Sequence, residues 1–214
     1  MIVIAGAGSG KTRVLTYKIA YLMTQGVDPF NILALTFTNK AAREMKERIA
    51  NIVGDEAKNL WMGTFHSVFA RILRIEAHKI GYTSNFTIYD SDDSQKLVAR
   101  IIKELNLDKE QYKYKIIFSR ISSMKNNFIS ADQYVNDEEM LLSDKISNRP
   151  KFHQIYKQYV DRCFKAGAMD FDDLLLKTNE LLNSYPDTLS KYQNIFRYIL
   201  VDEYQDTNHS QYLI

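Results

Sequence analysis

Apolar residues in the first third of the chain alternate between short continuous runs and longer stretches with a helical repeat. Glycine, proline or polar residues bound the short runs, as they do in buried strands, and the longer stretches place apolar residues three or four positions apart. We expect strands at 2–5, 32–37 and 60–64 and helices at 13–23, 39–53 and 67–80. Alternating strands and helices of these lengths predict a parallel sheet with helices on its faces.

The pattern changes after a further short apolar run at 86–89. Helical periodicity then dominates, residues 125–150 are polar and loop-like, and we expect no other strand before 198–201. The helices are expected at about 95–105, 110–124, 151–166 and 171–183. We therefore predict an α/β domain over 1–88 and 188–214, interrupted by an all-helical subdomain over 89–187.

A glycine-rich segment at 5–12, Ala-Gly-Ala-Gly-Ser-Gly-Lys-Thr, joins the first strand to the first helix. It fits the phosphate-binding loop of nucleotide-binding proteins, with Ala5 where the strict pattern has glycine. Such a loop aims several backbone N–H groups at one anion, and the following helix adds its positive end. A purely structural turn is the alternative. The residues expected to bind ATP are Ala7, Gly8, Ser9, Gly10, Lys11 and Thr12, with Lys11 on the β- and γ-phosphates and the Thr12 hydroxyl on Mg²⁺.

A second apolar run, 199–201, ends in the adjacent carboxylates Asp202 and Glu203. Carboxylates are costly to bury without a partner, so a purely structural role is disfavoured. We expect Asp202 to hold Mg²⁺ and Glu203 to activate the attacking water. A solvent-exposed acidic turn is the alternative. Lys11 and Asp202 are 191 positions apart, a gap that the helical insertion accounts for.

Five blocks, in their order along the chain, resemble those of superfamily 1 DNA helicases of the UvrD/PcrA/Rep type. They are the loop at 5–12 and the blocks at 36–45, 63–67, 170–175 and 202–208. Alanine is common at the first loop position in that family. The resemblance implies a P-loop NTPase (RecA-like) fold, in which a parallel sheet flanked by helices carries the inserted subdomain.

The resemblance also assigns residues to ligands. It implies that Arg13 lies near the adenine, that Gln205 belongs to the nucleotide site, and that the second and third blocks contact DNA. Phe37 could stack on a base, although a core aromatic is the alternative. His66 could donate to a phosphate or serve as a capping or core histidine. The residues expected to bind DNA are Phe37, Thr38, Asn39, Thr64, Phe65 and His66. Asp170, Asp172 and Asp173 could suggest a metal site, but an acidic helix start is favoured.

Composition and charge restrict the possible partners. The single cysteine excludes a disulfide framework or a Cys-rich zinc site, and no apolar run has the length of a membrane span. Residues 1–83 carry 11 Lys and Arg against 6 Asp and Glu, a net +5, whereas 84–188 carry 15 against 17, a net −2. The basic first segment is compatible with nucleic acid, and equally with a solvated face.

We expect the chain to be a cytoplasmic ATP-dependent DNA helicase or translocase that binds ATP, Mg²⁺, and single-stranded and duplex DNA. The resemblance implies 3′ to 5′ travel and a fragment that works with a second motor domain, nearly inactive in its absence. Three alternatives stay open: a RecB/AddA-type helicase–nuclease, a nucleotide-binding module without motor activity, and a P-loop kinase. The Asn-Lys-Ala-Ala sequence at 39–42 disfavours the first, and the DNA-like blocks disfavour the other two.

Overall fold

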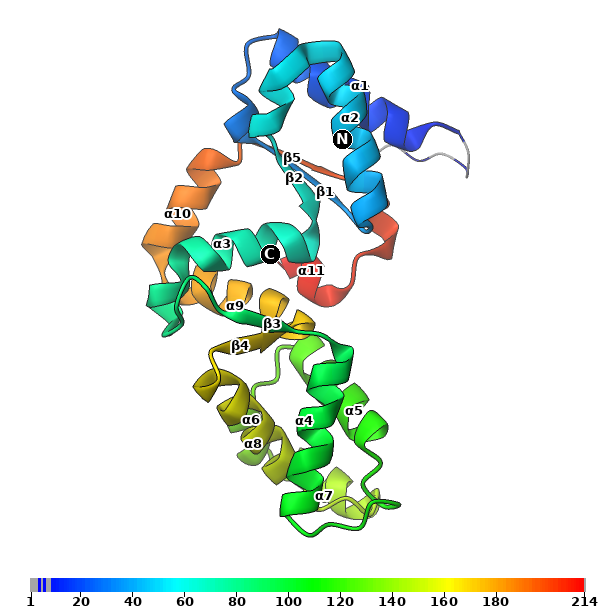
Figure 1. Ribbon diagram of the computed structural model, residues 1–214, viewed down its shortest axis with the longest axis vertical. Helices are drawn as coiled ribbons and strands as arrows, with labels where there is room; N and C mark the ends of the chain where they lie inside the picture. The colour runs from blue at the N-terminus through cyan, green and yellow to red at the C-terminus, as the bar shows by residue number, and fades with distance from the viewer. Residues whose placement is uncertain (1–3, 5, 7–8, 214) are drawn as a thin grey trace. The chain divides into compact units, whose positions relative to one another are not determined.

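The structure of the chain is a computed structural model that describes residues 4, 6 and 9–213 (Figure 1). The chain divides into two compact units: Met1–Arg71 with Leu181–Thr207, and Ile72–Glu180 with Asn208–Ile214. The insertion boundaries predicted at 88/89 and 187/188 stay a prediction. The division between the two units lies within a helix at 71/72 and within another at 180/181.

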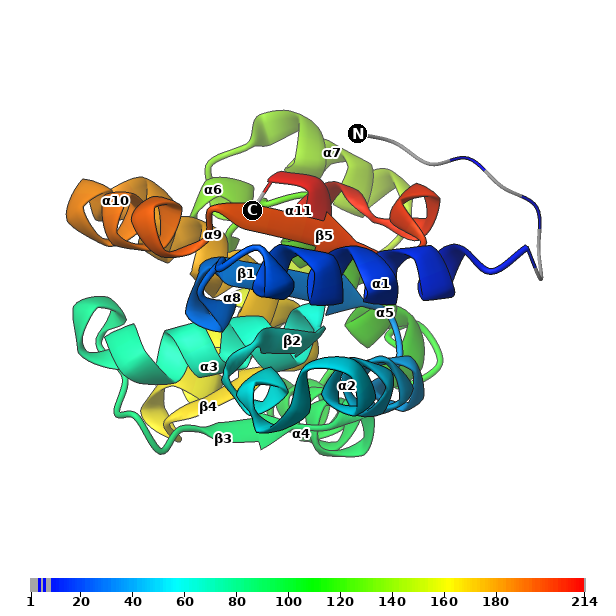
Figure 2. The same ribbon diagram turned by 90° about the horizontal axis from the view of Figure 1, so that it is seen from above.

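The first unit carries a three-stranded parallel sheet in the order β2-β1-β5. In Figure 2, β1 lies between β2 and β5. All five residues of β1 are buried, as expected of a central strand covered on both faces. The elements of this unit are α1 (Lys11–Thr24), η1 (Pro29–Asn31), β1 (Ile32–Thr36), α2 (Asn39–Val53), η2 (Gly54–Asn59), β2 (Trp61–Thr64), the first half of α3 (Phe65–Glu76), the end of α9 (Phe171–Ser184), α10 (Pro186–Ile195), β5 (Tyr198–Val201) and η4 (Tyr204–Asp206).

Side chains on the two faces of this sheet pack against different helices. Ile32 and Ala34 face α1 and α2, where Ile19 and Ile49 are fully buried. Trp61 lies opposite Leu33 in the ladder and faces the other side. Its ring meets those of Tyr192 and Phe196 at centroid distances of 6.4 Å and 5.2 Å, so the end of α10 covers that face.

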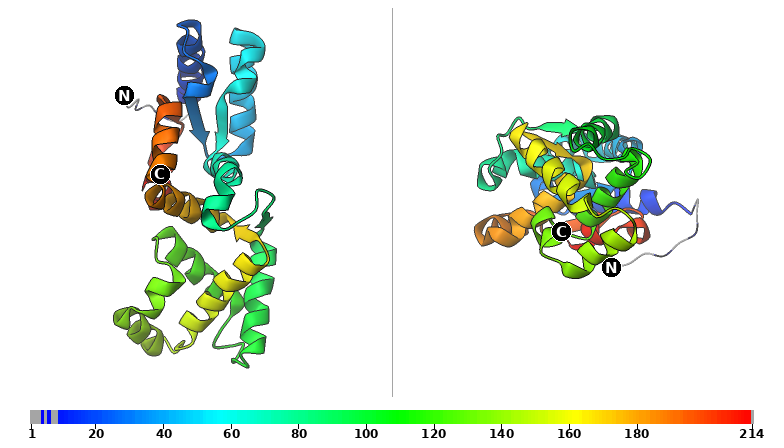
Figure 3. Two further views of the ribbon diagram at one scale, coloured as in Figure 1. Left: turned by 90° about the vertical axis from the view of Figure 1, so that its left-hand side faces the viewer. Right: turned by 90° about the horizontal axis from the view of Figure 1, so that it is seen from below.

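The second unit is mainly helical. One hydrophobic core joins α4, α5, α6 and α8, and Figure 3 shows α4 and α8 running side by side in green and yellow. Tyr134, Tyr156 and Tyr159 are among the largest fully buried side chains. The elements are the end of α3, η3 (Ala77–Ile80), β3 (Thr87–Tyr89), α4 (Ser91–Glu104), α5 (Tyr114–Asn126), α6 (Ala131–Val135), α7 (Glu138–Ile146), α8 (Phe152–Lys165), β4 (Ala168–Asp170), most of α9 and α11 (His209–Leu213).

The fold class predicted from the sequence is confirmed, with three corrections. The stretch 125–150 is not a loop, because it contains α6 and α7. The insertion is not wholly helical: β4 pairs in parallel with β3, Thr87 opposite Ala168. Helix α10 was not predicted. These elements have three to ten residues, and α6 is stabilised by a capping box between Ser130 and Gln133 rather than by a long apolar stripe.

The strand predicted at 2–5 is the remaining difference. Ile2, Val3 and Ala5 lie outside the described residues. Ile4 belongs to no strand, and its side chain is 93% exposed. The prediction of a buried strand is therefore wrong at this position. A strand is buried by its neighbours in a sheet, and Ile4 pairs with none of the three strands of the described sheet.

Candidate nucleotide-binding site and DNA edge

The carboxyl ends of the three parallel strands meet at one edge of the sheet. Thr36, the last residue of β1, lies opposite Thr64, the last residue of β2. On the other side of β1, the backbone N–H of Asp202 donates to the carbonyl of Leu35 at 2.9 Å. In open α/β sheets, ligands bind outside this edge. The fold therefore gathers the expected DNA blocks and the expected catalytic carboxylates there.

The described part of the glycine-rich loop makes a tight turn into α1. Ser9 Oγ donates to the Gly6 carbonyl at 2.6 Å. Gly10, the residue before α1, has φ +89°, a left-handed conformation that side chains rarely adopt. Ala5, Ala7 and Gly8 lie outside the described residues. α1 thus begins directly after the loop, and a helix start attracts an anion through its N–H groups.

Thr12 and Asp202 meet although 190 positions separate them in the sequence. Thr12 Oγ1 donates to Asp202 Oδ2 at 3.1 Å, and Asp202 is 6% exposed. A hydroxyl and one carboxylate are the protein ligands that Mg²⁺ uses when substrate phosphates and water complete its shell. The pair fits Mg²⁺, which would take the place of the hydrogen bond.

Lys11 and Glu203 form the second contact between the two segments. Lys11 Nζ is 3.7 Å from Glu203 Oε1 and also reaches the Gly6 carbonyl at 3.5 Å. Glu203 has φ +53°, which is unusual for a residue with a side chain, and Gln205 Nε2 donates to its Oε2. Backbone strain of this kind gathers at functional sites. The arrangement keeps a carboxylate beside the lysine expected to bind phosphate.

A hollow beside the loop is lined by Ser9, Gly10, Arg13, Val14 and Tyr17. The Arg13 guanidinium carbon lies 5.6 Å from the centroid of the Tyr17 ring. Arg13 was expected near the adenine. Tyr17 was not singled out, although its position four residues after Arg13 places it on the same face of α1. A guanidinium and an exposed ring suit a flat, electron-rich base.

The two aromatic residues expected to bind DNA differ in exposure. Phe37 is partly exposed at the end of β1, and its ring centroid is 5.6 Å from that of Phe65. Phe65 is 3% exposed and also packs on Phe69. Its burial leaves little of the Phe65 ring open to a base, and the ring packs against that of Phe37.

The polar members of the two DNA blocks lie at helix starts. Thr38 is the N-cap of α2, where its hydroxyl accepts from the Ala41 N–H at 3.1 Å. Thr64 Oγ1 accepts from the Ser67 N–H at 3.2 Å at the start of α3. Asn39 is exposed and His66 partly exposed. Two helix starts lie side by side, so both offer N–H groups at one edge.

The three aspartates at the start of α9 do not form a metal site. Lys125 is buried, and its Nζ lies 2.7 Å from Asp170 Oδ2 and 2.8 Å from Asp173 Oδ1. Burial and then Asp170 raise the pKa of Asp173 to about 6. Burial opposes the charge of Asp170 too, but Lys125 outweighs it and lowers the pKa of Asp170. The sequence did not connect Lys125 with these aspartates.

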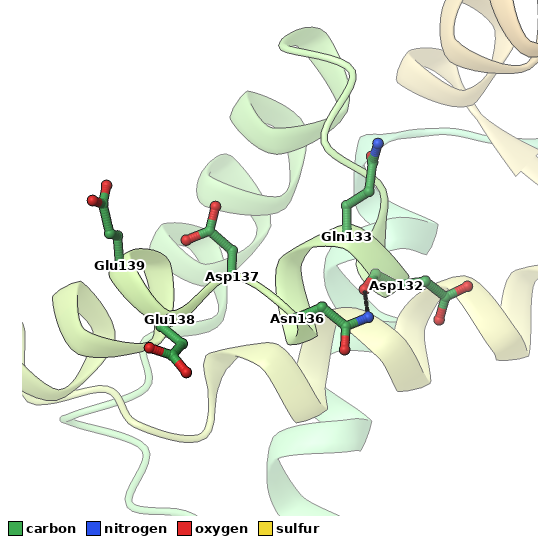
Figure 4. A pocket seen from close by; sticks show the side chains of 6 residues that line it. All are labelled: Asp132, Gln133, Asn136, Asp137, Glu138 and Glu139. Atoms are coloured by element: carbon green, nitrogen blue, oxygen red, sulfur yellow. Dashed lines mark hydrogen bonds between the residues drawn. The ribbon is translucent and has the colours of Figure 1, made fainter.

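A second hollow lies between α6 and α7 and is lined by four acids and two amides (Figure 4). The carboxylates point in different directions, and Asn136 Nδ2 donates to the Asp132 carbonyl at 2.8 Å. Within the described part of the chain, no group of three or more His, Cys, Asp or Glu side chains could hold a metal ion. None of the residues that line this hollow belongs to the glycine-rich loop or to the segment 202–208.

Comparison with known proteins decides the family. The family model of the UvrD/REP helicase N-terminal domain matches residues 1–214. The chain belongs to this family. The chain is 44% identical over 215 residues to the ATP-dependent DNA helicase PcrA of Staphylococcus epidermidis strain RP62A and 43% identical to that of Staphylococcus aureus strain Mu50.

Each alignment with these relatives covers all of the present chain and 29% of the relative. The chain thus spans less than a third of the length of the curated UvrD/REP proteins that it matches. In the part of the chain that the structure describes, none of the helices is long and apolar enough to cross a membrane.

Proposed function

We propose that this chain is the ATP-binding motor region of a DNA helicase or translocase that acts in the cytoplasm and moves 3′ to 5′ on single-stranded DNA. One observation carries the proposal. Thr12 lies 3.1 Å from Asp202, and Lys11 lies 3.7 Å from Glu203, across a gap of about 190 residues. These four side chains are the parts that phosphoryl transfer needs: a phosphate lysine, two metal ligands and a base.

ATP binding would use the loop and the hollow next to it. Backbone N–H groups at the start of α1 and the Lys11 ammonium would hold the phosphates. Arg13 and Tyr17 would hold the base. Thr12 and Asp202 would hold Mg²⁺, which when bound neutralises phosphate charge. When ATP binds, the Lys11 ammonium would leave the Glu203 carboxylate and contact phosphate oxygens instead. The carboxylate would then be available to accept a proton from water.

Hydrolysis would then depend on Glu203 as the general base. Gln205 orients this carboxylate, and the unusual backbone of Glu203 aims it at the loop. The transition state also needs positive charge on the γ-phosphate oxygens, and an arginine supplied for this purpose is worth about 10³–10⁵ in rate. By family resemblance such arginines come from a second motor domain. We therefore expect these 214 residues on their own to turn over ATP barely above background.

DNA would bind along the same edge of the sheet. Phe37 would stack on a base, and the helix starts at Thr38 and Thr64 would contact phosphates. Asp202 follows the strand next to the one that precedes Phe37. A movement of the Asp202 segment when ATP binds would therefore also move the DNA contacts. This shared edge favours a motor over a nucleotide-binding module, and the identity to PcrA helicases favours the UvrD/REP type over a helicase–nuclease.

The test is Glu203→Gln in a longer protein that carries both motor domains, compared with Glu56→Gln, which changes an exposed glutamate of η2. We expect Glu203→Gln to lower DNA-stimulated ATP turnover by about 10²–10⁴ while Mg-ATP binding is kept, because a general base contributes that much. Glu56→Gln should match the wild type. Unchanged turnover in Glu203→Gln would show that another group is the base.

A further inference from the structure

Helix α1 carries one buried polar side chain on a face that is otherwise apolar. Thr16 is 1% exposed, and the other buried side chains of the helix are Ile19, Ala20, Leu22 and Met23. A buried hydroxyl costs free energy unless it has a hydrogen-bond partner, and valine has nearly the same shape without this cost. Packing alone would therefore favour valine at position 16.

The Thr16 hydroxyl is bonded to the turn that begins the helix. Its Oγ1 donates to the Thr12 carbonyl at 2.8 Å, four residues back along the chain. Helical geometry gives the same carbonyl to the N–H of Thr16 as its acceptor. A threonine bonded in this way has a fixed side-chain rotamer and bends the helix slightly. Thr16 thus acts on the backbone of Thr12 as well as on its own turn.

The start of α1 needs such a bond, because Gly10 precedes it and has no side chain with which to cap it. The backbone bond that closes the first turn runs from the Val14 N–H to the Gly10 carbonyl at 3.0 Å. A capping side chain would occupy N–H groups that an anion uses. A helix start that binds an anion is therefore best fixed from within the helix, as the Thr16 hydroxyl does.

Thr12 is the residue of this turn on which the proposed metal site depends. Its hydroxyl donates to Asp202 Oδ2 at 3.1 Å, and the Asp202 N–H donates to the Leu35 carbonyl at 2.9 Å. Thr12 is thus bonded at its carbonyl by Thr16 and at its side chain to the carboxylate beside β1. All four residues belong to the same compact unit.

We propose that Thr16 is a positioning residue for Thr12. Its hydroxyl fixes the backbone of Thr12, and with it the direction of Thr12 Oγ1 toward Asp202, where Mg²⁺ would bind. Coordination of Mg²⁺ requires near-ideal octahedral geometry, so a small displacement of one ligand weakens it. The inference rests on the proposed function, because it concerns the metal of the proposed nucleotide site.

The Thr16 hydroxyl should matter for one part of ATP binding and not for the other. The loop and the Lys11 ammonium would hold the phosphates without a metal, whereas Thr12 and Asp202 would act through Mg²⁺. Removal of the hydroxyl should therefore weaken ATP binding when Mg²⁺ is present and leave it unchanged when the ion is chelated. A change that only damaged the packing of α1 would weaken both.

The experiment uses the 214-residue chain with Thr16→Val, which removes the hydroxyl and keeps the shape, and Thr16→Ser, which keeps the hydroxyl. The matched control is Thr24→Val, at an exposed threonine of the same helix whose Oγ1 donates to the Tyr21 carbonyl at 2.9 Å. Each variant is titrated calorimetrically with ATP in excess Mg²⁺ and again in EDTA. Hydrogen exchange at the Val14 amide measures the first turn of α1 without ATP.

We expect Thr16→Val to bind ATP about fivefold more weakly than the wild type in Mg²⁺, as the loss of one hydrogen bond allows, and equally well in EDTA. Exchange at the Val14 amide should be about fivefold faster for the same reason. Thr16→Ser should restore most of both losses, and Thr24→Val should match the wild type in all three measurements.

Two results would overturn the proposal: an unchanged affinity of Thr16→Val for ATP in Mg²⁺, or an equal loss of affinity with and without the ion. A wild-type chain that binds no ATP in either buffer would instead overturn the proposed function. Exchange at the Val14 amide would then decide alone whether the Thr16 hydroxyl fixes the first turn of α1.

Discussion

At the scale of single residues, exposure distinguishes Phe37, the proposed stacking residue, from Phe65. Both follow parallel strands directly, and their rings touch at a centroid distance of 5.6 Å. Phe65 is 3% exposed and belongs to the packed interior. Phe37 is more exposed, so the energy of base stacking should depend on it.

We expect Phe37→Ala to weaken the binding of a single-stranded oligonucleotide by about 1–3 kcal/mol, the usual contribution of one stacked base. Binding should also fall steeply with salt, because phosphate contacts supply most of the affinity. Fluorescence anisotropy at low salt measures both effects. The control is Phe30→Ala, which removes an aromatic side chain that is 48% exposed in η1. Equal affinities of the two variants for the oligonucleotide would show that Phe37 has only a structural role.

At the scale of elements, the start of α9 depends on two buried carboxylates that share one lysine. Burial first, and Asp170 second, raise the pKa of Asp173 from its usual 3.8 to about 6. Between these values the folded chain keeps a proton that the unfolded chain releases. The contribution of Asp173 to stability is therefore present below about pH 4 and is lost as the pH rises through about 6.

The matching prediction concerns Asp173→Asn, which keeps an acceptor for Lys125 and removes the titration. The free energy of unfolding of the wild type should contain a component that falls between pH 4 and pH 6.5, and the variant should lack it. Urea denaturation at several pH values measures this difference. Asp92→Asn, in the exposed first turn of α4, is the control and should keep the wild-type slope. An identical slope in Asp173→Asn would contradict the raised pKa.

The elements that could be predicted are those with a long, regular pattern. Helix α2 begins and ends where the apolar repeat of 39–53 does, and β5 matches the run 198–201. Helices α6 and α7 have five and nine residues and begin at side-chain caps, which a repeat measured over two or three turns does not detect. Strand β4 has three residues and forms only by pairing with β3, far away in the sequence.

At the scale of the whole molecule, the residues proposed for the nucleotide site could be chosen from the sequence, whereas the side chains that contact them could not. Thr12, Lys11, Asp202 and Glu203 stand out because each belongs to a short motif next to a strand. Residues outside such motifs carry no comparable signal. Tyr17 resembles an ordinary helix residue until the turns of α1 place the Arg13 guanidinium 5.6 Å from the centroid of its ring.

The central claim is that the loop before α1 and the carboxylates after β5 together bind Mg-ATP. Calorimetric titration of the 214-residue chain with Mg-ATP tests it directly, with Lys11→Ala as the variant. The control is Lys18→Ala, which changes an exposed lysine on the same helix. We predict measurable binding by the wild type and by Lys18→Ala, and none by Lys11→Ala, because the ammonium that holds the phosphates is lost. An unchanged affinity for Mg-ATP in Lys11→Ala would contradict the account.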